Sequence, residues 1–420
     1  MDREETKKKI RHNGERLLTV VRWTIFSLVT GLALGVIGAL FAKCISFVTE
    51  FRLAHRWVIF CLPFGAVLIL WLYRILHDEK DGGTNLVIEA IHADENIPLR
   101  MSPLIFVSTV LSHFCGASVG REGAALQLGG SIGNNIGKLF RFTDTDRKTM
   151  IMVGMSGVFS ALFGTAMSAS IFSMEMVSVG IMHYAALAPC VICSLTARAV
   201  AARLGVPAPF YVIESIPSLS IPAVLHVAVL SSLAGVLSAF FCICLHKGHK
   251  ISERLMPNKS LRALILGSSL LALTLLVGDQ TYNGAGGSYI AACLLGQERP
   301  LGFLLKILFT VISLSAGYKG GEIVPSFFIG ASFGALYGGI CGISPGLCAA
   351  IGMGSVFCGV TNCPISSFLI CLELFGFEGS PYFLLACALS FLTSGYHGLY
   401  TRQTIVYSKY RSNYINKRTH

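Results

Sequence analysis

The feature that most constrains this chain is its set of long apolar runs, the first of which covers residues 17–47. A run of 18 or more apolar residues with few charges is typical of a membrane-spanning helix. Of the 420 residues, 53% are hydrophobic and only 13% are charged, which is more apolar side chain than a water-soluble core of this length buries. The sequence therefore predicts an all-α, polytopic membrane protein.

Other apolar runs are shorter, and residues 104–114 and 290–295 cannot cross about 30 Å of hydrocarbon as straight helices. Many helices must therefore be tilted, broken or re-entrant. Short glycine-interrupted segments at corresponding places in two halves are typical of inverted-repeat transporters and channels, whose sites lie near the membrane midplane.

The sequence contains an internal repeat. Residues 154–159 (GMSGVF) recur 198 residues later as residues 352–357 (GMGSVF), and Glu175 falls on Glu373 at the same shift. Glu122 falls on Glu322 at a shift of 200 residues. We therefore predict a cytoplasmic segment at 1–16, a first transmembrane repeat at 17–205, a linker at 206–222, a second repeat at 223–410 and a cytoplasmic tail at 411–420. We expect no CBS domain or other soluble regulatory domain.

The formal net charge of +11 comes from basic residues that gather at the two ends and in short linkers. This distribution is typical of the cytoplasmic flanks of membrane proteins and does not indicate a nucleic-acid surface, so we expect both termini in the cytoplasm. The 14 cysteines lie mostly inside apolar runs without paired metal-ligand spacing. We expect core thiols rather than disulfides, and no metal or cofactor.

One acidic residue stands at membrane depth in the segment Gly120-Arg121-Glu122-Gly123. A charged side chain there costs at least about 3 kcal/mol. The residues that follow, 124–138, are compatible with a helix, and backbone N–H groups at a helix start form an anion site. Glu122 is predicted to occupy that site itself and to leave it when protonated or displaced. The alternative is structural: Glu122 caps the helix or pairs with Arg121.

These four residues resemble the signature of the CLC anion channels and transporters, and the resemblance covers almost the whole chain, including the repeat and the segment lengths. It implies two inverted halves in each subunit, a homodimer, and a separate anion pathway in each subunit. Glu122 matches the family's external gating glutamate, which competes with anions and carries protons. Gly120, Arg121 and Gly123 belong, by the same resemblance, to an anion-binding loop.

The family's first anion-binding loop, usually Gly-Ser-Gly-Ile-Pro, falls on Gly83, Thr84, Asn85 and Leu86. Thr84 takes the place of the central serine, and its hydroxyl offers one hydrogen-bond donor to an anion. The alternative is that Thr84 or Asn85 forms the N-cap of the helix that follows, and both roles are compatible.

The third loop, Gly-x-Phe-x-Pro in the chloride branch, falls on residues 321–325, with Ile323 in the place of Phe. Residues 317–322 are similar instead to the CLC-F branch, which exports fluoride in exchange for protons and uses a glutamate at the position of Glu322. A structural alternative pairs Glu322 with Lys319. Two positions depart from that branch: Thr84, where it commonly has a Met or Asn-like residue, and Val324, where it has Thr.

The family's anion-coordinating tyrosine, near the start of its last helix, matches Tyr400, with Tyr396 and Tyr407 as competing matches. A phenol offers a donor without bringing a charge, which suits a site that must release its ion. The alternative is a tyrosine of the interfacial belt.

Proton-coupled members of the chloride branch have a second, inner glutamate, which this chain lacks because Met176 follows Glu175. We predict that Glu175 and its repeat partner Glu373 are structural acids at symmetrical helix ends.

The function predicted is a fluoride/proton antiporter that exports fluoride across the bacterial cytoplasmic (inner) membrane. Its partners are fluoride or chloride, protons, the lipid bilayer and a second copy of the chain. The first alternative is a chloride/proton exchanger or an uncoupled chloride-type channel, which Thr84 favours and Glu322 opposes. A remote alternative is an enzyme, because residues 154–157 resemble the Gly-x-Ser-Gly motif of rhomboid intramembrane proteases. Gly354 replaces Ser156 in the second copy and no His is placed as its base, so no enzyme is expected.

Overall fold

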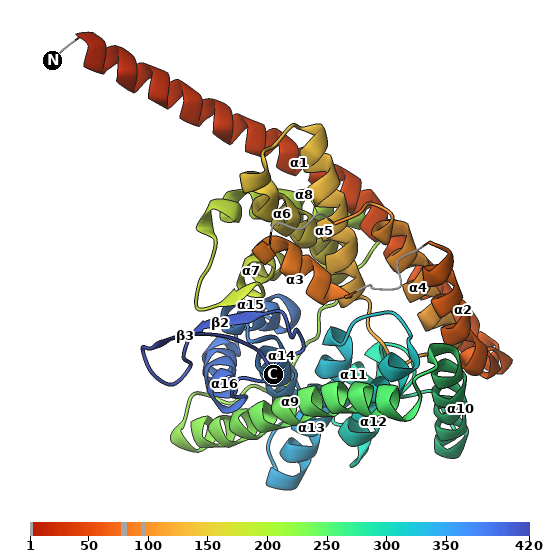
Figure 1. Cartoon of the computed structure of the whole chain (residues 1–420). Coiled ribbons are helices and arrows are strands. Elements are labelled where there is room, and N and C mark those ends of the chain that lie inside the picture. The colour runs from red at the N-terminus through yellow and green to blue at the C-terminus, as the bar shows by residue number, and fades with distance from the viewer. Residues whose placement is uncertain (1–2, 77–81, 94–96) are drawn as a thin grey trace.

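The computed structural model describes residues 3–76, 82–93 and 97–420 of the chain, and most of them are helical (Figure 1). The first half holds α1 (Arg3–Ala54), α2 (Leu62–Ile75), α3 (Thr84–Ala93), α4 (Met101–Cys115), α5 (Glu122–Leu139), α6 (Arg147–Phe163), α7 (Ala166–Glu175) and α8 (Leu187–Arg203). The second half holds α9 (Ile221–Leu255), α10 (Lys259–Val277), α11 (Gly287–Leu294), α12 (Gly302–Ala316), α13 (Ile323–Cys341), α14 (Pro345–Thr361), α15 (Pro364–Phe375) and α16 (Ser380–Thr393). Short 3₁₀ helices cover Arg56–Cys61, Asp144–Asp146 and Tyr184–Ala186. This architecture confirms the all-α prediction.

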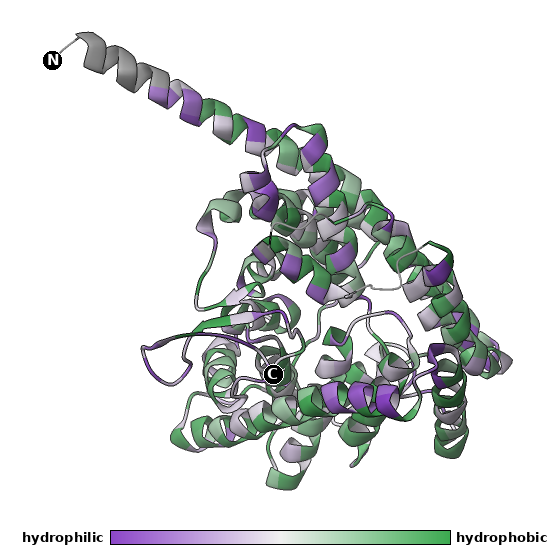
Figure 2. Ribbon diagram, in the orientation of Figure 1, coloured by the Kyte–Doolittle hydropathy of each residue, from purple (hydrophilic) through white to green (hydrophobic). Residues whose placement is uncertain are grey.

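Helix length varies as the apolar runs predicted. Among the described residues, six helical stretches are long and apolar enough to cross a membrane, and five further apolar helices have only 10–17 residues. Figure 2 shows apolar residues along most helices, with hydrophilic residues on the projecting part of α1 and at one end of α9. The chain is therefore a multi-pass membrane protein that combines long apolar helices with short ones.

The first helix is longer than its sequence suggested. The polar N-terminal residues are not separated from the first span by a turn, because α1 runs without a break from Arg3 to Ala54 and projects from the body (Figure 1). A single glycine, Gly14, interrupts this stretch, and one glycine weakens a helix without ending it.

The two halves pack their helices in the same pattern. The neighbours of the first half, such as α5 with α6, α1 with α8 and α6 with α7, recur in the second half as α13 with α14, α9 with α16 and α14 with α15. Each helix thus corresponds to the helix eight places later. The packing repeat is the structural counterpart of the sequence repeat and belongs to the inverted-repeat fold.

Glycines make the closest of these crossings possible. A Cβ on Gly129 of α5 would lie 2.2 Å from the carbonyl oxygen of Gly154 on α6, and a Cβ on Gly330 of α13 would lie 2.3 Å from that of Gly352 on α14. Small residues at helix crossings let backbones approach closely in membranes. The repeated sequence segments at 154–159 and 352–357 therefore mark equivalent helix contacts.

The end of the chain departs from the expected helix after Tyr400. Residues Thr404–Tyr407 form strand β2, which pairs in parallel with β1 (Ser178–Val179) and antiparallel with β3 (Tyr414–Arg418). The expectation of a last helix is therefore wrong for this chain. The physical reason is that Thr404, Ile405, Val406 and Tyr407 are β-branched or aromatic residues, which favour a strand.

Candidate functional site

Two loops, one from each half, meet back to back at the centre of the molecule. The first follows α4, which ends with Gly116 in the left-handed region at φ 91°, and leads to Glu122 at the start of α5. The second follows α12, which ends with Gly317 at φ 100°, and leads to Glu322, the N-cap of α13. Each glutamate thus lies at the N-terminal end of a helix, as the motif predicted.

The loops are joined by a pair of backbone hydrogen bonds. Gly120 N donates to Gly321 O at 2.6 Å, and Gly321 N donates to Gly120 O at 2.8 Å. A Cβ on Gly321 would lie 2.5 Å from the backbone nitrogen of Gly123, so no larger residue fits without moving the loops. The two hydrogen bonds between Gly120 and Gly321, called here the glycine bridge, join the two halves next to both acids.

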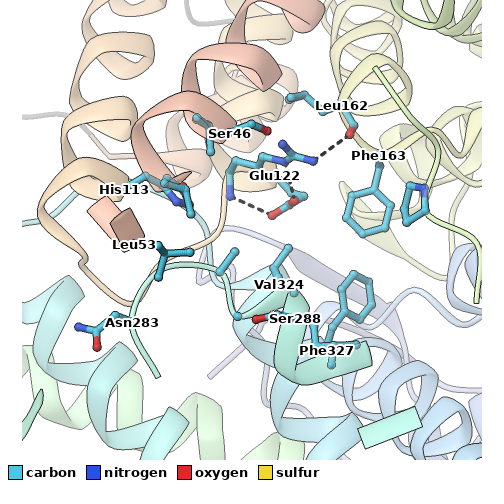
Figure 3. Close-up of a pocket in the computed structure, with 18 of the residues that line it drawn as sticks. Ser46, Leu53, His113, Glu122, Leu162, Phe163, Asn283, Ser288, Val324 and Phe327 are labelled. Carbon is cyan, nitrogen blue, oxygen red and sulfur yellow. Dashed lines mark hydrogen bonds and ion pairs between the residues drawn. The ribbon is translucent and has the colours of Figure 1, made fainter. Parts of the chain in front are cut away.

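A cavity of about 410 Å³, called here the gate cavity, lies on one side of the glycine bridge (Figure 3). Its lining includes Glu122, Arg121, Arg52, His113 and Val324. The Glu122 carboxylate is almost fully buried at 1% exposure. It accepts a hydrogen bond from Arg121 N at 2.9 Å, and its other oxygen lies 3.7 Å from the Arg121 Nε.

A second cavity of about 640 Å³, called here the tyrosine cavity, shares no lining residue with the gate cavity. Its lining includes Thr84, Gln127, Glu322 and Tyr400, together with the basic side chains His246, His249, Lys250 and Lys319. Gly320 and Glu322 line this cavity while Arg121 and Glu122 line the other, so the two repeat-related glutamates face different cavities.

Tyr400 lies in the tyrosine cavity as a buried side chain whose hydroxyl has no hydrogen-bond partner among the described residues. A buried phenol without a partner normally costs stability, so a free donor in the cavity that Glu322 also lines indicates a ligand site. The competing tyrosines lie elsewhere: the Tyr396 hydroxyl pairs with Ser408 Oγ at 2.7 Å, and Tyr407 is exposed in β2.

The first predicted loop reaches the same cavity, with Gly83, Thr84 and Asn85 in its lining. The Thr84 hydroxyl donates to Gly123 O at 3.2 Å, so in this conformation it holds the segment that follows Glu122. Asn85 Oδ1 accepts a hydrogen bond from Arg402 N at 3.1 Å, which ties this loop to the segment after Tyr400.

The remaining predicted residues are distributed between the compartments. Val324 lines the gate cavity beside Glu122, whereas Ile323 is fully buried and lines neither cavity. The Lys319 ammonium, the alternative partner of Glu322, lies 4.4 Å from the centre of the Tyr73 ring. The apolar Val324 and the hydroxyl of Thr84, the two departures from the fluoride branch, therefore face different cavities.

Sequence reasoning missed three polar residues. Gln127 lines the tyrosine cavity, and its Nε2 donates to Thr84 Oγ1 at 3.4 Å. Lys306 is fully buried in α12 and donates to the carbonyls of Tyr282 and Gly284, while Arg52, at 2% exposure, donates to the carbonyl of His113. Lys306 is an isolated charged residue in an apolar stretch, and a lysine in such a stretch was a signal that could have been followed.

The second pair of acids serves the packing of the two halves. Glu175 of α7 accepts hydrogen bonds from Ile365 N, Ser366 N and Ser366 Oγ at the start of α15. Glu373 of α15 accepts the equivalent bonds from Met167 N, Ser168 N and Ser168 Oγ at the start of α7. Each glutamate therefore caps the helix that carries the other glutamate.

The candidate protease serine is part of a helix contact. Ser156 is fully buried, and its hydroxyl donates to Val153 O at 2.8 Å and to Cys190 O at 3.2 Å. The two contacts of its hydroxyl give Ser156 a packing role between α6 and α8.

All 14 cysteines are free thiols.

Comparison with known proteins identifies relatives along nearly the whole chain. The sequence model of the family described as voltage gated chloride channel matches residues 64–395. A chloride/fluoride channel protein of Pseudomonas syringae pv. tomato is 33% identical over 398 residues, which cover 93% of this chain and 88% of the relative. The H⁺/Cl⁻ exchange transporter ClcA of Vibrio cholerae is 25% identical over 390 residues, which cover 83% of this chain and 81% of the relative.

A solved structure shares the fold closely. The crystal structure of a CLC-type fluoride/proton antiporter aligns with a TM-score of 0.88 and 32% sequence identity, covering 91% of this chain and 98% of that chain. The resemblance to the CLC family inferred from residues 120–123 is thereby confirmed.

Proposed function

The chain belongs to the voltage-gated chloride channel family, in which it is an anion/proton transporter, and from this membership we propose that it exchanges fluoride for protons. One observation carries the proposal: Glu122 lines one cavity and Glu322 lines the other, and the unpartnered hydroxyl of Tyr400 shares the second cavity with Glu322. Proton transport needs a titratable carrier in each compartment, and Glu122 and Glu322 supply the two carboxylates.

Glu122 is the gate in this mechanism. Its carboxylate occupies the N-terminal end of α5, where it accepts a hydrogen bond from Arg121 N and lies near the Arg121 guanidinium. An anion that enters this position competes for the same donors and displaces the side chain. Once displaced into the gate cavity, the carboxylate takes up a proton, because an isolated charge at membrane depth is costly.

The anion is held on the other side of the bridge by Tyr400 and the loop of Gly83, Thr84 and Asn85. The Tyr400 hydroxyl donates to the ion without adding charge, so the ion can leave again. Release of the Thr84 hydroxyl from Gly123 O would add a second donor. Glu322, in the same cavity, receives the proton that moves in the opposite direction.

Fluoride is favoured over chloride by Glu322. Fluoride is small and tightly hydrated, so a selective site must replace strong hydration with close donors, and a protonated carboxyl is such a donor. The relative from Pseudomonas syringae is named a chloride/fluoride channel protein, and the structural neighbour is a fluoride/proton antiporter. The structural neighbour supports fluoride/proton exchange, and the name of the relative is compatible with either anion.

Chloride exchange, or an uncoupled chloride channel, is the second candidate because of Thr84 and Val324. A hydroxyl faces the tyrosine cavity in the place of the chloride branch's serine, and no hydroxyl is present at Val324 in the gate cavity. The H⁺/Cl⁻ exchange transporter of Vibrio cholerae is also a relative.

The deciding experiment is anion-driven proton flux in proteoliposomes. The purified protein is reconstituted, a fluoride or a chloride gradient is imposed, and proton movement is followed with a pH electrode. We expect fluoride to drive protons against their gradient and chloride to drive them at least about tenfold more slowly. Equal proton movement with both anions would assign the protein to chloride/proton exchange, and anion flux without proton movement would make it a channel.

We also propose a homodimer in the bacterial cytoplasmic membrane, with both termini in the cytoplasm. The orientation is supported by Arg16 before the first span and by the basic residues 409–418 after the last. The dimer is supported by two exposed apolar residues at equivalent places, Met167 of α7 at 46% and Ile365 of α15 at 51%. Cross-linking of cysteines introduced at these two positions tests the interface, and a monomer in detergent and bilayer would contradict it.

A further inference from the structure

A buried imidazole shares the gate cavity with Glu122. His113, near the end of α4, is 1% exposed and lines the cavity (Figure 3). Within the described part of the chain its Nε2 has no hydrogen-bond partner. A buried polar atom without a partner is uncommon in folded proteins, so this nitrogen requires an explanation.

The ring lies near the same residue that the gate carboxylate touches. The imidazole lies near the backbone carbonyl of Gly120, which accepts the glycine-bridge bond from Gly321 N at 2.8 Å. Glu122 Oε2 lies so close to Gly120 that a Cβ on that glycine would be only 2.7 Å from it. His113 and the Glu122 carboxylate therefore both lie next to Gly120.

Positively charged side chains lie around His113. They are those of Arg121, Arg52 and Lys306, and the acids that line the gate cavity are Glu122 and Glu50. A further positive charge in this buried position is disfavoured. A neutral imidazole has one N–H and one acceptor nitrogen. In the tautomer that carries its N–H on Nδ1, the unpartnered Nε2 is the acceptor.

We propose that His113 is a positioning residue for the protonated gate, and that its Nε2 accepts a hydrogen bond from the carboxylic acid form of displaced Glu122. The proton stays on the Glu122 carboxyl in this contact, so no charge moves onto the ring. A carboxylate has no donor and is repelled by the Nε2 lone pair, so only the protonated gate is held in the cavity. The inference rests on the proposed proton-coupled transport and names a residue for its protonated intermediate.

The consequence is a change in the pH dependence of transport. Holding the acid form favours protonation, so it raises the pH at which half of the gates are protonated. Loss of about one hydrogen bond corresponds to about one pH unit. Removing the acceptor should therefore move the half-maximal pH of transport toward acid by about one unit, and lower the rate near neutral pH up to about tenfold.

The experiment compares three variants with the unmodified protein in proteoliposomes, with fluoride-driven proton flux measured from pH 5 to 8. His113→Leu removes both nitrogens, whereas His113→Gln keeps one donor and one acceptor. Thr109→Val, on the same helix and equally buried, is the control for packing of α4. We expect the acid shift in His113→Leu, a profile close to the unmodified one in His113→Gln, and no shift in Thr109→Val.

A structural measurement covers the case in which His113→Leu does not fold. The Glu122→Gln variant mimics the neutral gate and carries an N–H donor, so its amide should lie within hydrogen-bond distance of His113 Nε2 in an experimental structure. An amide directed elsewhere, or an unshifted pH profile in folded His113→Leu, overturns the inference. Failure of the proposed function can be told apart from failure of the His113 inference. If fluoride/proton exchange is wrong, the unmodified protein itself shows no fluoride-driven proton flux.

Discussion

The protein contains two pairs of repeat-related glutamates that experience very different surroundings. Glu175 and Glu373 each accept three hydrogen bonds from the start of a helix in the opposite half. Glu122, at 1% exposure against 8% for Glu175, accepts one backbone hydrogen bond within its own loop and faces a cavity, and Glu322 faces the second cavity. The difference teaches that burial alone does not identify a transport acid.

The position of each acid on its helix explains the difference. Glu175 and Glu373 lie near the C-terminal ends of short helices and reach the N-terminus of a partner helix, where several fixed N–H groups and the helix dipole hold a carboxylate permanently. Glu122 and Glu322 lie at helix N-termini themselves, so an anion can take their place at the same donors. A cavity beside each one gives the displaced side chain somewhere to go.

The largest expected effect comes from Glu122→Gln. A neutral amide neither titrates nor competes as an anion, so fluoride-driven proton uptake should fall by at least about 100-fold. The measurement is proton uptake in proteoliposomes. Passive fluoride flux, measured in parallel, confirms that the variant is folded and inserted. Proton uptake that survives this substitution would remove Glu122 from the proton path.

The next largest effect is expected on stability, from Glu373→Ala. This change leaves Met167 N, Ser168 N and the Ser168 hydroxyl without their acceptor at the start of α7. We expect the free energy of unfolding to fall by about 2–4 kcal/mol. Thermal unfolding in detergent measures the loss.

The Glu373→Ala variant also tests whether the two pairs of glutamates have different roles. Protein that remains folded should keep the fluoride-to-proton ratio of the unmodified transporter, because Glu373 lines neither cavity. Glu175→Ala should have the same effects, because it removes the equivalent hydrogen bonds at the start of α15. A changed fluoride-to-proton ratio in either variant would contradict the view that Glu175 and Glu373 are structural while Glu122 and Glu322 take part in transport.

Part of this arrangement was predictable from the sequence. The membrane class, the repeat and the signature at residues 120–123 follow from apolar runs and local motifs, which do not depend on distant contacts. The structural role predicted for Glu175 and Glu373 agrees with their contacts, because the repeat already paired them. The strand at Thr404–Tyr407 was missed, although its β-branched residues were visible, because the family resemblance favoured a helix.

The contacts that tune the site were not predictable. His113 lies in an ordinary apolar run, and only the fold shows that it lines the same cavity as Glu122. Likewise, the Asn85 side chain reaches Arg402 N, more than 300 positions away in the chain. Such roles depend on which loops meet in space, and one sequence carries no local signal for that.

A moderate effect is expected from Glu322→Ala. If Glu322 receives protons in the tyrosine cavity, its loss should slow coupled turnover by about tenfold, since Glu122 and Tyr400 remain. Glu322→Gln, which keeps the size and hydrogen-bonding groups of the side chain but cannot titrate, should be slowed as much as the alanine variant. An unaltered rate in the glutamine variant would place Glu322 with the structural acids instead of with Glu122.

The smallest effect concerns a partnered acid outside the spanning helices, Asp279, which accepts a hydrogen bond from Thr281 N at 2.9 Å and pairs with Arg299 at 2.7 Å. Burial raises the pKa of this carboxyl, but the bonds from Thr281 and Arg299 lower it more, so it lies below the ordinary 3.8. Its contribution to stability is therefore present above about pH 3.8 and is lost as the pH falls through the lower folded-state pKa. Because both side chains are well exposed, Asp279→Asn should cost only about 0.5 kcal/mol at pH 7 and nothing at about pH 2. Unfolding curves at the two pH values measure this difference. If Asp279→Asn lowered the free energy of unfolding as much as Glu373→Ala does, an exposed ion pair would contribute as much stability as a carboxylate that caps a helix.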